Sequence, residues 1–479
     1  MSQLVAAATW LLLAMEGVTL QEVASAIGGQ AIGIVRPETV VSGVAIDSRS
    51  VRPGELFWAL RGEKHDGHDF ANEAIRRGAS AAVVQSEQPT HKIPAIPAIA
   101  VPDTLRALSE FAGWHRKRQE ALIVGVTGSF GKTTTRAMIH AVLSAGFPGT
   151  QSPKNYNNHL GVPLSLLEIE RRHEFAVLEF GASGIGEIET LSRIAAPEVG
   201  VVTGIAPAHL ERFGGIENII LAKGELLESL PVGGFAILPG DDPITSGMAR
   251  RAACPAIFIG EREHNDLRAI DIAIRNGRIS FTADGHRYQL HATGRHHVQA
   301  ALIALAIGRE VGMSPADMER GLEIFQSVPG RCVTERIGRW TVIDDTYNAN
   351  PASMRAACDT LRDWRTAGRK LLVAGDMLEL GTEATARHRA LGRYAAACGI
   401  DRIAVHGIHA GEVIRGCLEQ GMSADRLAEC QDIDVLLMTL DCWLDDTAVL
   451  LVKGSRGMRM ERVIEHWKEQ ARQSNRRAA

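Results

Sequence analysis

The sequence predicts an α/β protein built from three domains. Its 479 residues would form about three domains at a usual size of roughly 150 residues each. Short apolar runs alternate with helix-patterned segments along most of the chain, and this alternation predicts parallel sheets covered by helices. Apolar residues make up 45% and charged residues 23% of the chain, as in ordinary globular domains. The composition therefore argues against disorder or a coiled coil as the main state.

Charge and cysteine usage exclude further classes of protein. The 52 Lys+Arg and 56 Asp+Glu residues give a formal charge of −4, so no overall positive field would attract nucleic acid, and we expect no nucleic-acid partner. The seven cysteines form no CxxC pair, which argues against structural zinc and fits a cytoplasmic protein. The apolar run at residues 4–15 is too short to span a bilayer and predicts a packed N-terminal helix, with a peripheral membrane contact as the alternative.

Two boundaries divide the chain into domains of residues 1–118, 119–328 and 329–479. Before residue 119, Leu105, Leu108, Phe111 and Ala112 lie at helical spacing. After it, the apolar run at 121–128 is typical of a strand buried on both faces. The second boundary follows from the Pro-Gly pair at 329–330. Within the central domain, Asn-Gly and Asp-Gly pairs in residues 255–293 predict antiparallel hairpins added to the parallel sheet.

Polar residues follow six apolar runs at the points where the predicted strands end. In open α/β sheets, ligands bind beyond the carboxyl ends of the strands. The pattern therefore predicts a site between the central and C-terminal domains. The polar residues at these strand ends are Ser129, Lys132 and Thr133; Glu179; His209; Asp344, Asp345 and Tyr347; Asp376; and Lys453 with Ser455.

The strongest local motif is GSFGKTT at residues 128–134, between a predicted strand and a predicted helix. In that context, glycines let the backbone approach phosphate groups, and amides at the helix start bind their oxygens. Lys132 would reach the β- and γ-phosphates and Thr133 would hold Mg²⁺. Val126 stands where the common motif has its first glycine. The alternative is a glycine-rich turn with an incidental lysine. The residues of the motif are Gly128, Ser129, Phe130, Gly131, Lys132, Thr133 and Thr134.

The remaining candidates are ambiguous when each is taken alone. Glu179 and His209 are metal-ligand candidates, but a helix cap and a structural histidine are equally ordinary roles. The spacing around Lys223 alone predicts a surface lysine. Asn157 and Asn158 are typical of a turn. The segment 344–351 is also turn-like, but it follows a strand, so it is expected to bind a ligand such as a ribose or an amino group.

Taken together, these motifs resemble the Mur ligase family of ATP-dependent amide ligases, from about residue 42 to about residue 460. Residues 47–84 are similar to the family's UDP-binding segment. The C-terminal segments GDMLELG (375–381) and LVKGSR (451–456) resemble those of members that add D-Ala-D-Ala. No DNPR motif of the members that add the third amino acid is present. Folylpolyglutamate synthases share the loop but lack the UDP-binding segment and the C-terminal pair.

The resemblance implies an N-terminal UDP-sugar-binding domain, a central P-loop domain with a mostly parallel sheet, and a Rossmann-like C-terminal domain. It also implies a cytoplasmic, monomeric enzyme that uses ATP and Mg²⁺. The carboxylate of UDP-MurNAc-tripeptide would attack ATP to give an acyl phosphate, which the amine of D-Ala-D-Ala would then attack. The connector 328–331 would be the hinge for domain closure.

The resemblance also assigns roles to individual residues. Lys132 would bind phosphate, while Thr133, Glu179, His209 and a carbamylated Lys223 would hold metal ions. Expected ATP contacts besides the loop are Arg331, Asp345, Tyr347, Asn348 and Asn350. Expected substrate contacts are Ser48, Arg49 and Asp66, with Gly67 and His68, and also Asn157, Asn158, Lys453, Ser455 and Arg456.

Four positions depart from the family pattern. His297 and Ala300 occupy positions where the family usually has asparagines that help to place adenine, and Gly204 and Ser183 likewise replace asparagine. These departures leave three alternatives open beside an active D-Ala-D-Ala-adding enzyme. They are a catalytically silent nucleotide-binding homologue, a ligase of different amino-acid specificity, and a plain P-loop kinase.

Overall fold

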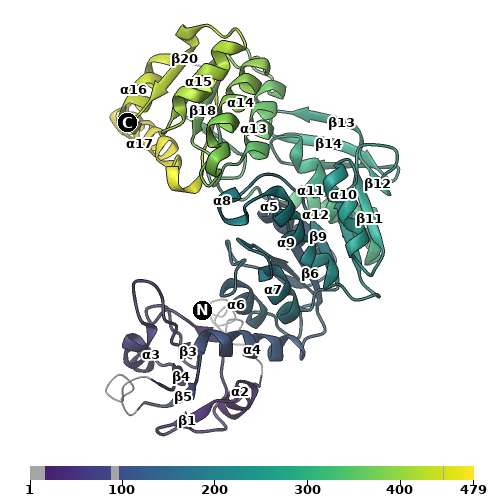
Figure 1. Cartoon of the computed structure of the whole chain (residues 1–479), viewed down its shortest axis with the longest axis vertical. Coiled ribbons are helices and arrows are strands. Elements are labelled where there is room, and N and C mark those ends of the chain that lie inside the picture. Colours follow the sequence, from purple (N-terminus) through teal and green to yellow (C-terminus); the bar gives the residue numbers. More distant parts are fainter. Residues whose placement is uncertain (1–16, 88–95, 446, 479) are drawn as a thin grey trace.

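The computed structural model describes residues 17–87, 96–445 and 447–478. The described chain forms an elongated molecule with three parts stacked in chain order (Figure 1). The helix predicted at residues 4–15 lies outside the described residues. Within the described ranges, no helix is long and apolar enough to cross a membrane.

The N-terminal part is built on a five-stranded sheet in the order β1-β5-β4-β3-β2, in which only β1 runs antiparallel to its neighbour. Helix α4 is the helix predicted before residue 119. It starts where Asp103 accepts hydrogen bonds from the amides of Leu105 and Arg106, and it buries Leu108 and Phe111. The elements are α2 (Leu20–Ala26), β1 (Gln30–Ile32), β2 (Val44–Ala45), β3 (Leu56–Trp58), η1 (Gly67–Phe70), α3 (Ala71–Arg76), β4 (Ala81–Gln85), β5 (Ala98–Val101) and α4 (Thr104–Arg116).

The central part contains a seven-stranded parallel sheet in the order β12-β11-β10-β9-β6-β8-β7. Strand β6, which carries the phosphate-loop motif at its end, lies between β8 and β9. The elements are β6 (Leu122–Thr127), α5 (Lys132–Leu143), β7 (Gly149–Gln151), α6 (Gly161–Leu167), β8 (Phe175–Glu179), α7 (Glu187–Ala195), β9 (Val199–Val202), α8 (Leu210–Phe213), α9 (Ile216–Glu228), β10 (Phe235–Pro239), α10 (Pro243–Gly247), η2 (Met248–Arg251), β11 (Ala256–Gly260), β12 (Leu267–Arg268), α11 (His296–Glu310) and α12 (Pro315–Ile324).

The predicted hairpins are present, but they form a sheet of their own. Strands β13 (Ile270–Arg275), β14 (Arg278–Ala283) and β15 (His286–Leu290) pair antiparallel through Asn276-Gly277 and Asp284-Gly285 turns. The expectation that they add to the parallel sheet was wrong. Phe281 and Tyr288 instead pack into the same buried cluster as Leu302 of α11, so side-chain packing, not strand pairing, attaches this sheet.

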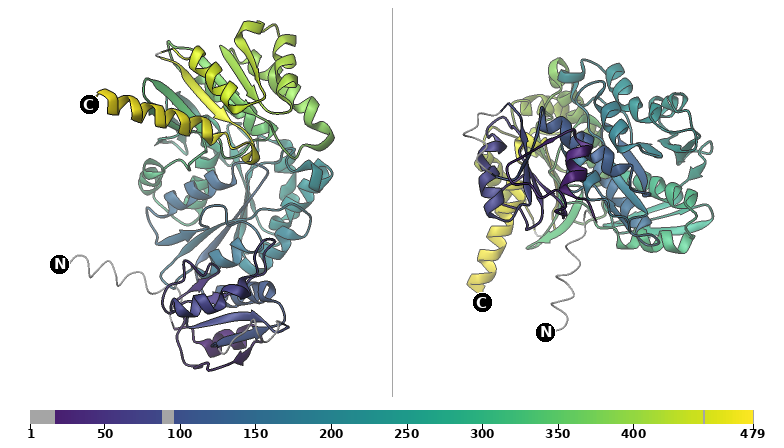
Figure 2. Two further views of the ribbon diagram at one scale, coloured as in Figure 1. Left: turned by 90° about the vertical axis from the view of Figure 1, so that its left-hand side faces the viewer. Right: turned by 90° about the horizontal axis from the view of Figure 1, so that it is seen from below.

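The C-terminal part has a six-stranded sheet in the order β16-β17-β21-β18-β19-β20, parallel except for the β16-β17 hairpin. Helix α17 extends from the body of the molecule (Figure 2). The elements are β16 (Val333–Ile337), β17 (Trp340–Asp345), α13 (Pro351–Asp363), β18 (Lys370–Gly375), η3 (Gly381–Glu383), α14 (Ala384–Ala397), β19 (Arg402–His406), α15 (Ala410–Glu419), η4 (Ala424–Arg426), β20 (Leu427–Cys430), α16 (Ile433–Trp443), β21 (Val449–Lys453), η5 (Arg456–Met458) and α17 (Glu461–Ala478).

The sheet orders explain why the predicted site residues gather. In the central sheet β9, β6 and β8 are neighbours, and in the C-terminal sheet β17, β21 and β18 are neighbours. These six strands are the ones whose ends carry the predicted polar residues.

Candidate active site

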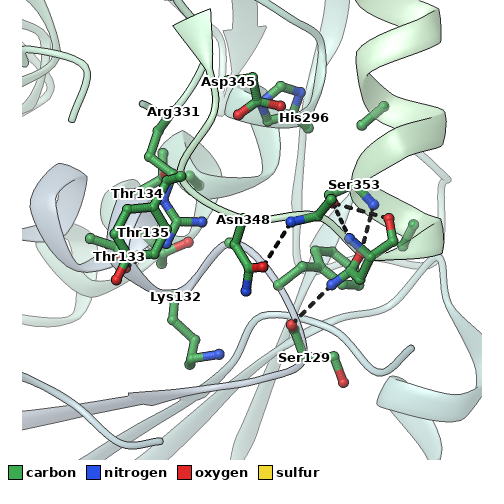
Figure 3. Close-up of a pocket in the computed structure, with 18 of the residues that line it drawn as sticks. Ser129, Lys132, Thr133, Thr134, Thr135, His296, Arg331, Asp345, Asn348 and Ser353 are labelled. Carbon is green, nitrogen blue, oxygen red and sulfur yellow. Dashed lines mark hydrogen bonds between the residues drawn. The ribbon is translucent and has the colours of Figure 1, made fainter. Parts of the chain in front are cut away.

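A cavity of about 330 Å³ lies between the central and C-terminal parts. Residues of both parts line it, and Figure 3 shows Arg331 of the C-terminal part beside Thr133 of the phosphate loop. The polar residues of the central part that line it are Ser129, Lys132, Thr133, Thr134, Thr135, Asn157, Glu179, His209, His296 and Gln299. Those of the C-terminal part are Arg331, Asp345, Tyr347, Asn348, Asn350, Ser353 and Lys453.

The phosphate-loop motif adopts the strand–loop–helix geometry predicted for it. Gly131 has a left-handed backbone (φ 75°) directly before α5. A side chain on Gly128 (φ 142°) would lie 2.2 Å from the Thr203 hydroxyl, so only glycine fits there. The Lys132 amine donates to the Gly128 carbonyl at 2.7 Å, which folds the lysine over its own loop. Val126 lies inside β6 and is fully buried, so the absent first glycine falls in the strand, where no turn requires it.

The positive charge around the cavity exceeds the negative charge. Burial lowers the pKa of Lys132, which the Glu179 carboxylate opposes and the Arg331 guanidinium reinforces. The buried Arg136, on α5, lies 3.4 Å from the Glu179 carboxylate, and it also donates to the Lys154 carbonyl at 2.7 Å. Lys132, Arg331 and Lys453 line the cavity with Glu179 and Asp345, and Arg136 lies next to Glu179. The cations therefore outnumber the carboxylates, which favours an anionic ligand such as a polyphosphate.

The predicted metal ligands meet only in part. Thr133, Glu179 and His209 line the same cavity, and Asn157 donates to Glu179 at 2.9 Å. His209 instead contacts Glu379 of the C-terminal part. No group of three or more His, Cys, Asp or Glu side chains forms a complete metal site among the described residues. One hydroxyl and one carboxylate still suit Mg²⁺, which usually takes one or two protein carboxylates and completes its shell with phosphate oxygens and water.

Lys223 is buried, so the surface position that spacing alone predicts was wrong. Its side chain is 4% exposed because α9 packs on α7 and buries the face that carries Ala222, Lys223 and Leu226. The amine lies 3.5 Å from the Ala182 carbonyl and 5.5 Å from the Phe213 ring centre. Burial, reinforced by the nearby Lys132 charge, lowers the pKa of Lys223 to about 7. Lys223 thus has a large neutral fraction at neutral pH.

The loop after β17 connects the C-terminal part to the phosphate loop. The Asp345 carboxylate pairs with the buried Lys453 amine at 2.7 Å, and Lys453 also donates to the Asn348 carbonyl at 2.8 Å. Asn350 caps α13 and donates to the Ser129 carbonyl at 3.3 Å. The Arg331 guanidinium lies 4.0 Å from the Tyr347 ring centre and donates to the Thr133 hydroxyl at 3.4 Å.

The segments after β18 and β21 contain three further polar residues from the sequence analysis, Asp376, Ser455 and Arg456. Ser455 and Asp376 are buried, whereas Arg456 is exposed. The Ser455 hydroxyl is buried, accepts from the Leu378 amide at 2.9 Å, and shapes the backbone of the site. Asp376 accepts from the Ile408 amide at 2.7 Å. The Arg456 side chain is 65% exposed, lies near the Tyr347 ring and pairs with the Glu461 carboxylate at 3.4 Å.

A second, larger cavity of about 1150 Å³ lies in the N-terminal part. It is lined by Ser48, Arg49, Arg61, Gly67 and Arg77, among others. The predicted Asp66 does not line it. Its carboxylate instead accepts from the His68 amide at 3.1 Å and thereby caps η1.

The segment 157–160 reaches both cavities. Asn157 lines the interdomain cavity, while His159 and Leu160 line the N-terminal one. The Asn158 side chain accepts from the Gly161 amide at 2.9 Å, so it shapes the start of α6. One extended ligand could therefore contact this segment and both cavities.

Two of the positions that depart from the family pattern, Gly204 and His297, lie in tightly packed surroundings. A side chain at Gly204 (φ 151°) would lie 2.4 Å from the Phe130 ring, so asparagine would not fit there. His297 is buried, and burial lowers its pKa to about 3. The neighbouring His296 and Gln299 line the site, and Gln299 donates to the Thr203 carbonyl at 2.6 Å.

Sequence reasoning missed four residues near the site. Three of them, His296, Gln299 and Arg136, lie on helices next to motifs that the sequence analysis recognised. They do not belong to the motifs themselves, so the motifs did not indicate that they line or flank the site. Glu379 lies inside the GDMLELG segment, but only the fold shows that it faces His209.

The fold and the site define an α/β nucleotide-binding enzyme whose phosphate loop faces a C-terminal Rossmann-like domain. Three family models match the chain: the catalytic domain of the Mur ligase family at 40–116, the Mur ligase middle domain at 126–308, and the Mur ligase glutamate ligase domain at 330–456. The chain belongs to the Mur ligase family.

Within that family, several curated proteins that resemble this chain carry the same name. The UDP-N-acetylmuramoyl-tripeptide–D-alanyl-D-alanine ligase of Bacillus subtilis is 33% identical over 93% of this chain and 97% of its own length. The enzyme of the same name from Escherichia coli is 34% identical over 94% and 98%.

Solved structures of the same kind of enzyme match the fold. A crystal structure of MurF from Acinetobacter baumannii covers 95% of this chain and 100% of its own, with a TM-score of 0.87 and 32% identity. MurF ligase from Thermotoga maritima in complex with ADP covers 91% and 99%, with a TM-score of 0.79 and 28% identity.

Proposed function

We propose that the chain is the ATP-dependent ligase that joins D-alanyl-D-alanine to UDP-MurNAc-tripeptide and gives UDP-MurNAc-pentapeptide for peptidoglycan synthesis. The observation that carries the proposal is the cationic cavity in which Lys132 faces Arg331 across two domains. The names of the full-length relatives support the substrate assignment. We also propose domain boundaries at 118/119 and 328/329, and a cytoplasmic monomer.

ATP would bind with its phosphates on the 128–134 loop. The amides at the start of α5 and the Lys132 amine would bind the phosphate oxygens. Arg331 and Asn350 contact this loop from the C-terminal part, Tyr347 packs against Arg331, and Asp345 lines the same cavity. The adenine would lie toward His296 and Gln299, which line both this cavity and an adjoining one of about 280 Å³. Thr133 and Glu179 would hold Mg²⁺, with His209 as a further ligand. The ion would offset the charge of the phosphates.

In the first step, the chain's own residues would mainly supply positive charge. The tripeptide carboxylate and the γ-phosphate are both anions, so their approach needs fixed positive charge. Lys132 and Arg331 supply it within the cavity, and the buried Arg136 supplies it next to Glu179. The carboxylate oxygen bonds to the γ-phosphorus and the bond to ADP breaks, which leaves an acyl phosphate. The amine of D-Ala-D-Ala then forms the amide bond, and phosphate leaves with the former carboxylate oxygen.

Lys223 is proposed to act as a carbamate. A neutral lysine amine can add CO₂ with loss of a proton, and the resulting anion carries hard oxygen donors that suit Mg²⁺. The lowered pKa of Lys223, about 7, supports this chemistry because it leaves much of the amine neutral.

The UDP-sugar is proposed to occupy the N-terminal cavity beside Ser48 and Arg49. The peptide would then extend past the segment 157–160 to the phosphate loop, since that segment borders both cavities. Arg456, which is exposed beside the Tyr347 ring and pairs with Glu461, would exchange that ion pair for the carboxylate of D-Ala-D-Ala. Asp66, Asn158, Lys453 and Ser455 would act through the backbone segments that they hold.

Isotope transfer tests the chemistry. Tripeptide labelled with ¹⁸O in its terminal carboxylate is incubated with ATP, Mg²⁺ and D-Ala-D-Ala, and the released phosphate is analysed by mass spectrometry. The mechanism predicts one labelled oxygen in the phosphate. Unlabelled phosphate would refute an acyl phosphate, and a stable phosphorylated product without an amide bond would identify a kinase.

A further inference from the structure

His209, a predicted metal ligand of the central part, is held by a carboxylate of the C-terminal part. Its Nδ1 is hydrogen-bonded to Oε2 of Glu379, in the loop after β18. The neighbouring Glu211 carboxylate accepts from the Gly381 amide at 3.2 Å, and Leu210 packs against the C-terminal core. Figure 1 shows α8, which follows His209, beside the C-terminal part. The contact therefore belongs to a row of contacts between residues 209–211 of the central part and residues 379–381 of the C-terminal part, which we call the interdomain seam.

The backbone is unusual on both sides of this contact. His209 has φ 54° and Glu379 has φ 63°, which is a left-handed conformation that residues with side chains rarely adopt. Such conformations persist only where the surrounding structure holds them, and they cluster at functional sites. Two of them meet here in one hydrogen bond, which points to a role for the contact beyond packing.

We infer that Glu379 is a positioning residue that fixes the tautomer and orientation of His209, and does so only when the central and C-terminal parts are together. The carboxylate accepts the Nδ1–H proton, so Nε2 keeps its lone pair for a ligand in the cavity that His209 lines. Metal-binding histidines commonly have their other nitrogen held in this way. The inference rests on the proposed function for the nature of that ligand, but not for the contact itself.

Histidine tautomers measured by ¹⁵N NMR on the full chain, alone and with ADP, test the contact without turnover. The His209 signal is assigned by its loss in His209→Gln. The parent is expected to show His209 protonated on Nδ1. Glu379→Ala is expected to move the proton to Nε2, and Glu379→Gln, which keeps an acceptor oxygen, to retain part of the parent signal. Glu383→Ala is the matched control, since Glu383 is exposed and pairs with Arg387 outside the seam. The same tautomer in parent and Glu379→Ala would overturn the inference.

Metal affinity tests the consequence. Mn²⁺ binding to the ADP complex is measured by electron paramagnetic resonance. Glu379→Ala is expected to weaken it about 10- to 100-fold, with no further loss in a His209→Ala background. Equal losses in both backgrounds would overturn the inference. A parent that shows the Nδ1–H tautomer but makes no pentapeptide would refute the proposed function alone. Full turnover by Glu379→Ala would refute the positioning role alone.

Discussion

Replacing Lys223 by alanine tests the least ordinary part of the proposed site. The lowered pKa of this lysine, about 7, makes roughly half of its amines neutral at pH 7. An ordinary lysine with a pKa of about 10.4 is neutral in only about four molecules in ten thousand. The fraction of neutral amine, the form that adds CO₂, is therefore about a thousandfold higher for Lys223 than for an ordinary lysine. Burial is the main cause of this shift, so the effect belongs to the folded chain.

The expected result is a loss of turnover. Lys223→Ala should lower kcat at least about 100-fold, the scale observed when one group that stabilises transition-state charge is removed. Short carboxylic acids added to this variant should restore part of the rate, because they can replace the missing carbamate oxygens. Lys117→Ala is the control, since Lys117 is exposed.

The assay combines phosphate release with ¹³C NMR of protein equilibrated with ¹³C-bicarbonate. The parent should give a carbamate signal that Lys223→Ala lacks. The signal should weaken as the pH falls below 7, because protonation removes the reactive amine. Parent-like turnover by Lys223→Ala, or an unlabelled parent, would rule out a functional carbamate on Lys223.

Three further predictions concern folding, nucleotide binding and closure. His297→Asn should reduce acid sensitivity: the parent His297 is neutral when folded (pKa about 3), so its contribution to stability is complete above the unfolded pKa of about 6.5 and decreases as the pH falls toward 3. By pH 5 the parent is expected to have lost about 2 kcal/mol of unfolding free energy through His297. Chemical denaturation at pH 7 and pH 5 measures this loss. An equal loss of stability in parent and variant would contradict the prediction. Arg331→Ala should weaken ATP binding by about 10- to 100-fold in calorimetry, and Arg331→Lys should not restore it, because the planar stack on Tyr347 is lost; unchanged affinity would count against the phosphate contact. Small-angle scattering should show compaction about the 328–331 connector when an ATP analogue and UDP-MurNAc-tripeptide bind, and unchanged dimensions would exclude that hinge.

The sequence predicted the fold well because its signals are local. Continuous apolar runs such as 122–127 identified parallel strands, and the polar residues at their ends identified the edge where the site lies. Gly128, Gly131 and Lys132 form the predicted loop because glycine geometry is encoded within a few residues.

What the sequence could not show depends on contacts between distant segments. Nothing near Lys223 indicates that α7 covers it, and nothing near Glu379 indicates that His209 lies opposite. The hairpins at 270–290 were recognisable from their turns, but their attachment by side-chain packing was not. The family resemblance implied substrate contacts for Asp66 and Asn158, but in the fold their side chains accept backbone hydrogen bonds at the starts of helices.

Phosphate release from ATP is the most direct test of the proposed ligase activity. Purified chain with Mg²⁺ and UDP-MurNAc-tripeptide is assayed with and without D-Ala-D-Ala, and the product is weighed by mass spectrometry. We expect phosphate release that requires both substrates, together with the mass of UDP-MurNAc-pentapeptide. Bound ATP with no phosphate release and no pentapeptide, in a preparation that retains its fold, would contradict it and favour a catalytically silent homologue.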